Sequence, residues 1–233
     1  MRISVIIPCY NTERYLADAL TSACNQLPPP HEVIVVDDGS TDGSASIAER
    51  FGAPVRCARL AHAGIGAARN HGLALASGDV IAFLDADDLW TADSVSLRLA
   101  ELERDPALDC AGGLTEQFVS PDLPEDMQRR LVCPPGASAA RLAGALLIRR
   151  AVFDRVGLFE PSLRLGETID WIARADAAGV TMRMVDTVVL RRRLHDANTG
   201  TREAHQRSDY LRVLKAALDR KRGGGNSRDA PQD

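Results

Sequence analysis

The stretch from Val80 to Trp90, VIAFLDADDLW, joins an apolar run to three carboxylates within four positions, Asp85, Asp87 and Asp88. The apolar run is typical of a buried β-strand, and the acidic residues follow its carboxyl end. Like charges this close repel one another and raise one another's pKa, so the cluster requires a positive partner. Because open α/β sheets bind ligands beyond the carboxyl ends of their strands, the sequence predicts a ligand site here.

Similar strand ends occur earlier in the chain. The apolar run ISVII (3–7) leads into Pro8-Cys9-Tyr10-Asn11, and EVIVVDD (32–38) leads into Gly39-Ser40. Helical periodicity separates these runs, which predicts a parallel sheet with helices on both faces. The predicted strands are 3–7, 32–38, 55–60 and 80–84, and the predicted helices are 15–24, 44–52, 66–76 and 93–105.

The second half of the chain has a less regular pattern. The sequence predicts a polar surface loop over 115–138, a strand and a short helix within 143–159, and a helix from about Asp170 to Gly179. Two short strands, 182–185 and 188–191, are expected to follow. We divide the chain into an α/β domain (1–200), an amphipathic helix (201–222) and a disordered tail (223–233). The amphipathic helix could pack on the domain, form a homodimer or contact an anionic membrane.

Composition narrows the class of protein. The chain has 233 residues, 45% hydrophobic and 26% charged, with a net charge of −4, which argues against a nucleic-acid partner. No apolar run approaches the roughly 20 residues of a membrane span, and the N-terminus does not resemble a secretory signal. The five cysteines include no CxxC pair. We therefore expect reduced thiols and a cytoplasmic location, with peripheral contact with the inner membrane face as an open alternative.

Several kinds of site place acidic residues after a strand. An EF-hand loop starting at Asp85 would need Gly at position 90 and Glu at position 96, where Trp90 and Ser96 stand. A haloacid-dehalogenase-like phosphatase would need Thr in place of Leu89. A third arrangement fits better: a divalent cation held by one or two carboxylates and by the phosphates of a nucleotide. A P-loop and a complete GxGxxG motif are both absent.

Four segments together resemble family 2 glycosyltransferases of the GT-A fold. They are SVIIPCYNTERYLADALTSACNQ, EVIVVDDGSTDGS, GIGAARNHGLALASGDVIAFLDADD and GALLIRRAVFDRVGLFEPSL, and the likeness runs in order over about residues 1–196. The resemblance implies an α/β protein with a mostly parallel central sheet flanked by helices. It also implies a nucleoside-diphosphate sugar as donor, with a UDP-sugar as the expected form. The implied cofactor is Mn²⁺ or Mg²⁺, and the implied reaction inverts the anomeric carbon.

The resemblance also assigns residues to the nucleotide pocket. Pro8 and Tyr10 match residues that line this pocket, and Glu13 matches a position that reaches the nucleoside. Asp38 matches the carboxylate that contacts the base. Asp85 matches the first carboxylate of the DxD motif, which faces the ribose or the donor sugar.

The metal ligands follow from the same resemblance. Asp87 matches the second carboxylate of DxD, which binds the metal, and His195 matches a position near the diphosphate and the metal. Asp88 could share the metal with Asp87. Arg69, in the Ala-Arg-Asn sequence, either approaches the donor or pairs with a carboxylate. The arginines 191–193 either add positive charge near the phosphates or form a solvated strand edge.

The position of the general base departs from the family pattern. Within LGETIDW, Thr168 stands where most relatives carry the Asp that accepts the proton, and a threonine hydroxyl is not a base at neutral pH. Glu167 and Asp170 are the candidate catalytic carboxylates, with Glu167 preferred. Asp170 could equally be a helix N-cap. The ring of Trp171 could hold a sugar or peptide acceptor.

The leading hypothesis is therefore a metal-dependent inverting glycosyltransferase. The acceptor hydroxyl could belong to a polysaccharide, a lipid-linked sugar or a peptide. Because the usual Asp is missing, a catalytically silent GT-A-like module that binds a nucleotide or a partner protein stays as the alternative. A sugar nucleotidyltransferase would need a Gly-rich, basic loop where PCYNTERY stands.

Overall fold

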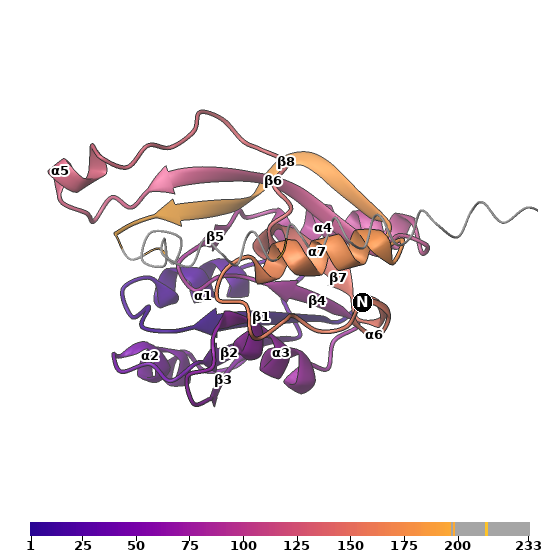
Figure 1. Ribbon diagram of the computed structural model, residues 1–233, viewed down its shortest axis with the longest axis horizontal. Helices are drawn as coiled ribbons and strands as arrows, with labels where there is room; N and C mark the ends of the chain where they lie inside the picture. The colour runs from indigo at the N-terminus through magenta and orange to yellow at the C-terminus, as the bar shows by residue number, and fades with distance from the viewer. Residues whose placement is uncertain (197, 199–212, 214–233) are drawn as a thin grey trace, which may run out of the picture.

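The computed structural model describes residues 1–196, 198 and 213, and contains one eight-stranded sheet in the order β3-β2-β1-β4-β7-β6-β8-β5 (Figure 1). The strands are β1 (Ile3–Cys9), β2 (Glu32–Asp37), β3 (Val55–Arg59), β4 (Val80–Phe83), β5 (Leu89–Trp90), β6 (Cys110–Val119), β7 (Leu146–Arg149) and β8 (Met182–Leu194). The helices are α1 (Leu16–Cys24), α2 (Ser44–Phe51), α3 (Ile65–Leu75), α4 (Ser94–Arg104), α5 (Glu125–Gln128), the 3₁₀ helix η1 (Ala143–Ala145), α6 (Ala151–Val156) and α7 (Glu167–Ala177).

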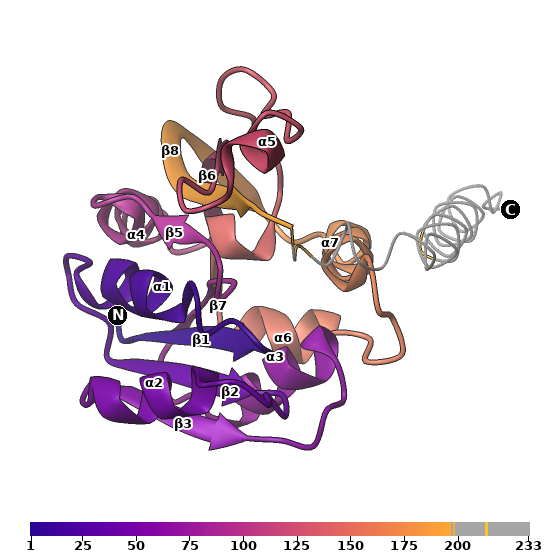
Figure 2. The ribbon, with the colours of Figure 1, turned by 90° about the vertical axis from the view of Figure 1, so that its left-hand side faces the viewer.

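The first four strands form the parallel half of the sheet, as the sequence predicts. β1 pairs in parallel with β2 and β4, and β2 pairs in parallel with β3. Successive residues of each strand point to opposite faces, so that Val5 packs in one core and Ile6 in the other. Figure 2 shows α1, α2 and α4 on one face of the sheet and α3, α6 and α7 on the other. Burial on both faces explains why β1, β2 and β4 are continuously apolar, whereas the edge strand β3 is partly exposed.

The second half of the sheet differs from the prediction. β7 is antiparallel to β4 and β6, while β6 and β8 run side by side in parallel (Figure 1). The predicted loop at 115–138 is wrong in its first part, because residues 115–119 extend β6 along β8. The two predicted strands are one strand, β8. Register shifts opposite β8, on either side of Leu114, account for the polar break that separates them in the sequence.

Helix α7 begins three residues earlier than predicted. Its first residue is Glu167, and the residue before it, Gly166, has a φ of 82°, which a residue with a side chain rarely adopts. Asp170 is therefore inside the first turn of α7 and is not an N-cap. The predicted helix at 201–222 and the tail at 223–233 lie outside the described residues, apart from Val213. No helix of the described chain is long and apolar enough to span a membrane.

Glu32 joins the amino-terminal ends of the parallel strands. Its Oε1 accepts hydrogen bonds from the Ser4 hydroxyl and from the backbone and hydroxyl of Ser77, each at 2.7 Å. Its Oε2 accepts from Arg56 Nη2 at 2.9 Å. Burial alone would raise the pKa of Glu32, but these hydrogen bonds outweigh burial and lower the pKa from 4.5 to about 2. The ionised form of Glu32 therefore stabilises the folded state.

We predict that Glu32→Gln lowers the free energy of unfolding at pH 7 by about 1–3 kcal/mol, because Ser4, Ser77 and Arg56 lose a charged acceptor. Because the folded-state pKa is depressed, the stabilisation is present above pH 4.5 and is lost as the pH falls toward 2. Urea unfolding at several pH values measures both effects. Glu49→Gln, at an exposed ion pair with Arg59, is the control. Equal pH slopes for wild type and Glu32→Gln would contradict the prediction.

Candidate active site

Asp85 is neutralised by a buried arginine of the neighbouring helix. Arg69 of α3 donates from Nη2 to Asp85 Oδ1 at 2.8 Å, and from Nη1 to Glu167 Oε1 at 2.5 Å and to Thr168 Oγ1 at 2.9 Å. The Arg69 side chain is 2% exposed. Burial alone would lower the pKa of its guanidinium, but Asp85 and Glu167 reverse the direction and raise it. Of the two alternatives for Arg69, the structure shows the pairing with carboxylates.

Asp87 faces the end of β8. Its Oδ2 lies 2.9 Å from His195 Nε2 and accepts a longer hydrogen bond, 3.4 Å, from Asn198 Nδ2. The Asn198 side chain also holds the backbone, because its Oδ1 accepts from His195 N at 2.7 Å. The structure therefore brings together the two residues that the resemblance assigned to the metal.

Asp88 is buried and is held by backbone. Its Oδ1 accepts from the backbone nitrogen of Arg193 at 2.9 Å. Burial, followed by the charges of Asp87 and Asp85, raises the pKa of Asp88 well above its usual range. The Arg193 guanidinium is itself buried and pairs with Asp18 at 3.0 Å. Among the arginines 191–193, Arg193 is therefore neither part of a solvated strand edge nor unpaired, because its guanidinium is buried against Asp18.

The loops after β1 and β2 are fastened to each other. Asn11 Oδ1 accepts from the backbone nitrogen of Thr41 at 2.8 Å, and the backbone nitrogen of Thr12 donates to Ser44 Oγ at 2.9 Å. Asn11 has a φ of 52°, a left-handed conformation that Asn tolerates better than most residues. The Glu13 carboxylate accepts from Gly43 N at 2.6 Å. Glu13 was predicted to reach the nucleoside. In the structure its carboxylate binds the backbone of the loop after β2.

The predicted nucleotide pocket lies beside these loops. Pro8 is buried within β1, opposite Val36 of β2, whereas Tyr10 is 44% exposed. Asp38 is buried, and its two carboxylate oxygens accept from the backbone nitrogens of Ala63 and Gly64, each at 2.8 Å. Asp38 thus fixes the loop that leads into α3, which carries Arg69.

Asp170 and Trp171 contact residues outside the acidic cluster. Asp170 pairs with Arg174 at 2.9 Å, and Arg174 also donates to the backbone oxygens of Val156 and Leu158, which ties α7 to the end of α6. Trp171 is 1% exposed and packs against Phe153, so the prediction that its ring holds an acceptor is wrong.

The arrangement fits a divalent cation that takes part of its ligands from a substrate. Among residues 1–196, 198 and 213, no three His, Cys, Asp or Glu side chains form a closed metal site. Asp87 and His195 supply one carboxylate and one imidazole in direct contact, next to two further carboxylates. Mg²⁺ commonly binds through one or two carboxylates plus phosphate oxygens, which matches this open donor set.

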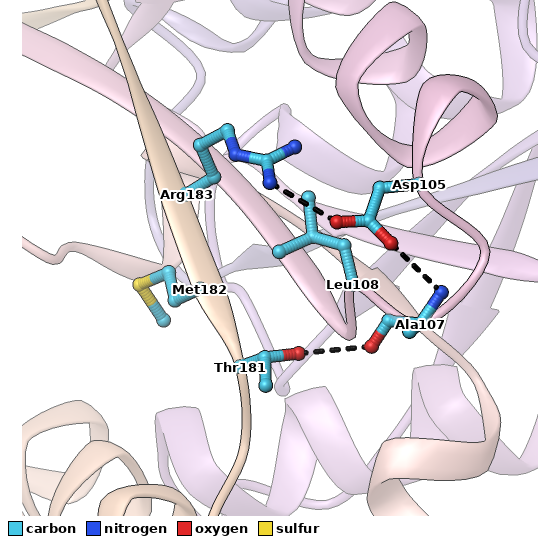
Figure 3. A pocket seen from close by; sticks show the side chains of 6 residues that line it. All are labelled: Asp105, Ala107, Leu108, Thr181, Met182 and Arg183. Atoms are coloured by element: carbon cyan, nitrogen blue, oxygen red, sulfur yellow. Dashed lines mark hydrogen bonds and ion pairs between the residues drawn. The ribbon is translucent and has the colours of Figure 1, made fainter.

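A surface pocket elsewhere has no part in this site. It lies between the end of α4 and the start of β8, and is lined by Asp105, Ala107, Leu108, Thr181, Met182 and Arg183 (Figure 3). Arg183 pairs with Asp105 at 3.0 Å, and Thr181 donates to the backbone oxygen of Ala107. Its polar groups thus bond one another. β6 and β8 both begin at this pocket. It therefore lies at the opposite end of the sheet from Asp85, Asp87 and Asp88.

Sequence reasoning did not single out His62, and it assigned no role to the backbone of Arg193. His62, on the loop after β3, contacts Asp38, and the backbone of Arg193 holds Asp88. A signal for His62 was present, since it follows a predicted parallel strand and so stands at the edge where ligands bind. No sequence signal pairs the Arg193 backbone with Asp88, because these residues are 105 positions apart.

Comparison with solved structures identifies the class of fold. The chain superposes on the crystal structure of S. aureus TarS 1–349 with a TM-score of 0.72 and 22% identity, over 94% of this chain and 65% of that chain. The TarS 1–349 structure in complex with UDP-GlcNAc gives a TM-score of 0.73 at 22% identity, over 94% of this chain and 66% of that one. The predicted GT-A-like α/β fold is confirmed.

The sequence then places the chain in a family. The family model described as Glycosyl transferase family 2 matches residues 4–157, and the chain belongs to this family. It is 28% identical to an uncharacterized glycosyltransferase of Rickettsia typhi, over 89% of this chain and 69% of that protein. It is 26% identical to the chondroitin synthase of Escherichia coli, over 94% of this chain and 33% of that protein. The predicted assignment as a glycosyltransferase is confirmed. The chain thus spans 69% of the length of the Rickettsia protein and 33% of the length of the chondroitin synthase.

We predict that Arg69→Met lowers the free energy of unfolding by about 3 kcal/mol, because Asp85 and the buried Glu167 lose their shared cation. Thermal and urea unfolding at pH 7 measure the change. Arg59→Met removes an arginine from an exposed pair with Glu49 and should cost at most about 1 kcal/mol. Equal losses in the two variants would show that the buried cluster does not depend on Arg69.

Proposed function

We propose that the chain transfers a sugar from a nucleoside-diphosphate sugar to an acceptor hydroxyl, with inversion at the anomeric carbon and with Mn²⁺ or Mg²⁺ as cofactor. One observation carries the proposal: the exposed Tyr10, Asp38, the Asp85–Asp88 cluster and Glu167 gather at the carboxyl edge of β1, β2 and β4. The solved TarS complexes with UDP and with UDP-GlcNAc support a UDP-sugar as the donor.

The donor would lie along this edge. Tyr10 offers an exposed ring on which a base stacks, and Asp38 is an acceptor for a base N–H. Asp85, whose side chain is 38% exposed, is placed to accept hydrogen bonds from ribose or sugar hydroxyls. Asp87 and His195 would hold the metal. When bound, the metal neutralises the diphosphate and stabilises it as a leaving group.

The general base is proposed to be Glu167. Both of its hydrogen bonds in the described chain, from Arg69 and Thr168, fall on Oε1, which leaves Oε2 for the acceptor hydroxyl. As the hydroxyl oxygen bonds to the anomeric carbon, its proton passes to Glu167. The bond from that carbon to the diphosphate breaks, and its electron pair leaves with the diphosphate. Asp170 is the weaker candidate, because its partner Arg174 also binds the backbone at the end of α6, whereas the partner of Glu167 binds Asp85 of the acidic cluster.

We predict that the wild type binds one of UDP, dTDP or GDP in a metal-dependent manner, and that Asp87→Ala weakens this binding at least about tenfold, because a metal ligand is lost. Isothermal titration calorimetry with Mn²⁺ and with a chelator measures both. Asp93→Ala is the control, since Asp93 is exposed and its side chain caps no helix. If no nucleoside diphosphate binds with Mn²⁺, the proposal is wrong.

We also predict that Glu167→Gln lowers kcat for release of the nucleotide from its sugar by about 100-fold or more, because the proton acceptor is lost. Its Kd for the nucleotide should change less than twofold, which also reports that the fold is intact. Asp170→Asn should lower the melting temperature and leave kcat within about threefold. Nucleotide binding without any sugar release by the wild type would favour the catalytically silent module, for which Thr168 is the supporting observation.

A further inference from the structure

The imidazole of His62 covers the predicted base site. Its ring stacks on the Tyr10 ring with centroids 4.1 Å apart and an angle of 23° between the planes. Its Nδ1 lies 2.9 Å from Asp38 Oδ2 and 3.1 Å from the Asp38 backbone oxygen. An ionised carboxylate only accepts hydrogen bonds, so Nδ1 is the donor in this contact.

These two contacts are the ones that a nucleotide base would need. A base is a flat aromatic ring that stacks on Tyr10, and its ring N–H requires the acceptor that Asp38 offers. We propose that His62 occupies the place of the base in the nucleotide-free protein, and that a nucleotide binds only when this imidazole leaves. The inference rests on the proposed function, and it makes His62 a residue that sets nucleotide affinity.

The imidazole can leave without unfolding the loop that carries it. The backbone nitrogens of Ala63 and Gly64 hold this loop on Asp38 through hydrogen bonds of 2.8 Å, independently of the His62 side chain. The His62 side chain is 43% exposed, whereas the Asp38 side chain is 4% exposed. Among the described donors to this carboxylate, His62 is the only side chain, so it is the donor that a ligand can replace.

The expected effect follows from competition for one place. If only a fraction of the molecules has the imidazole displaced, the apparent Kd equals the intrinsic Kd divided by that fraction. Removing the imidazole makes every molecule competent, so the nucleotide should bind more tightly. A residue that merely contacted the ligand would have the opposite effect when removed.

The test compares UDP binding to wild type, His62→Ala and His31→Ala by calorimetry with Mn²⁺. We expect His62→Ala to bind UDP about three- to tenfold more tightly than wild type, and His31→Ala, an exposed histidine far from Tyr10 in the sequence, to bind like wild type. Equal or weaker binding by His62→Ala overturns the inference while the proposed function stands. Binding by His62→Ala alone supports the inference. If no variant binds UDP, dTDP or GDP, both proposals are overturned.

A spectroscopic measurement on the unmodified chain tests the displacement itself. The imidazole C–H resonances of His62, assigned by their loss in His62→Ala, should be shifted by the Tyr10 ring current in the free protein. We expect saturating UDP with Mg²⁺, which is diamagnetic, to move them toward the values of a solvent-exposed histidine. Resonances that stay in place while UDP binds would overturn the inference.

Discussion

Three carboxylates at the end of one central strand are the constraint on which the rest of the site depends. Burying like charges is costly unless each receives its own partner. The structure supplies these partners from different elements: a guanidinium from α3 for Asp85, an imidazole for Asp87 and a backbone nitrogen of β8 for Asp88. α3 and β8 must therefore both reach the end of β4, which places them around the site.

The position of Arg69 in turn depends on how closely α3 approaches the sheet. Gly72 lies one turn after Arg69 and faces β1. A Cβ atom at Gly72 would come within 2.3 Å of Ile6 Cγ2, so a larger residue would push α3 away. The close approach buries Arg69. Its Cζ atom lies 5.8 Å from the ring centroid of Phe83 and 5.4 Å from that of Phe159. A glycine in the middle of a helix, usually unfavourable, is explained by this packing.

The parallel half of the fold was predictable because β1, β2 and β4 are buried on both faces, which leaves apolar runs in the sequence. β6 was missed because its second half is half-buried from Glu116 onward and includes the polar residues Glu116 and Gln117, a pattern that resembles a surface loop. The acidic motif and Glu167 were also identifiable from the sequence. Their partners were not, because the contact between Arg69 and Glu167 spans 98 positions and exists only in the folded chain.

The site lies on a seam between two parts of the chain. The segment that matches the family model ends at residue 157, before α7 and before the end of β8. Arg69 crosses from the first part to Glu167, and the backbone of Arg193 crosses back to Asp88. The sequence after residue 157 can therefore change while residues 4–157 stay the same, provided that the contacts of Arg69 with Glu167 and of Arg193 with Asp88 are kept.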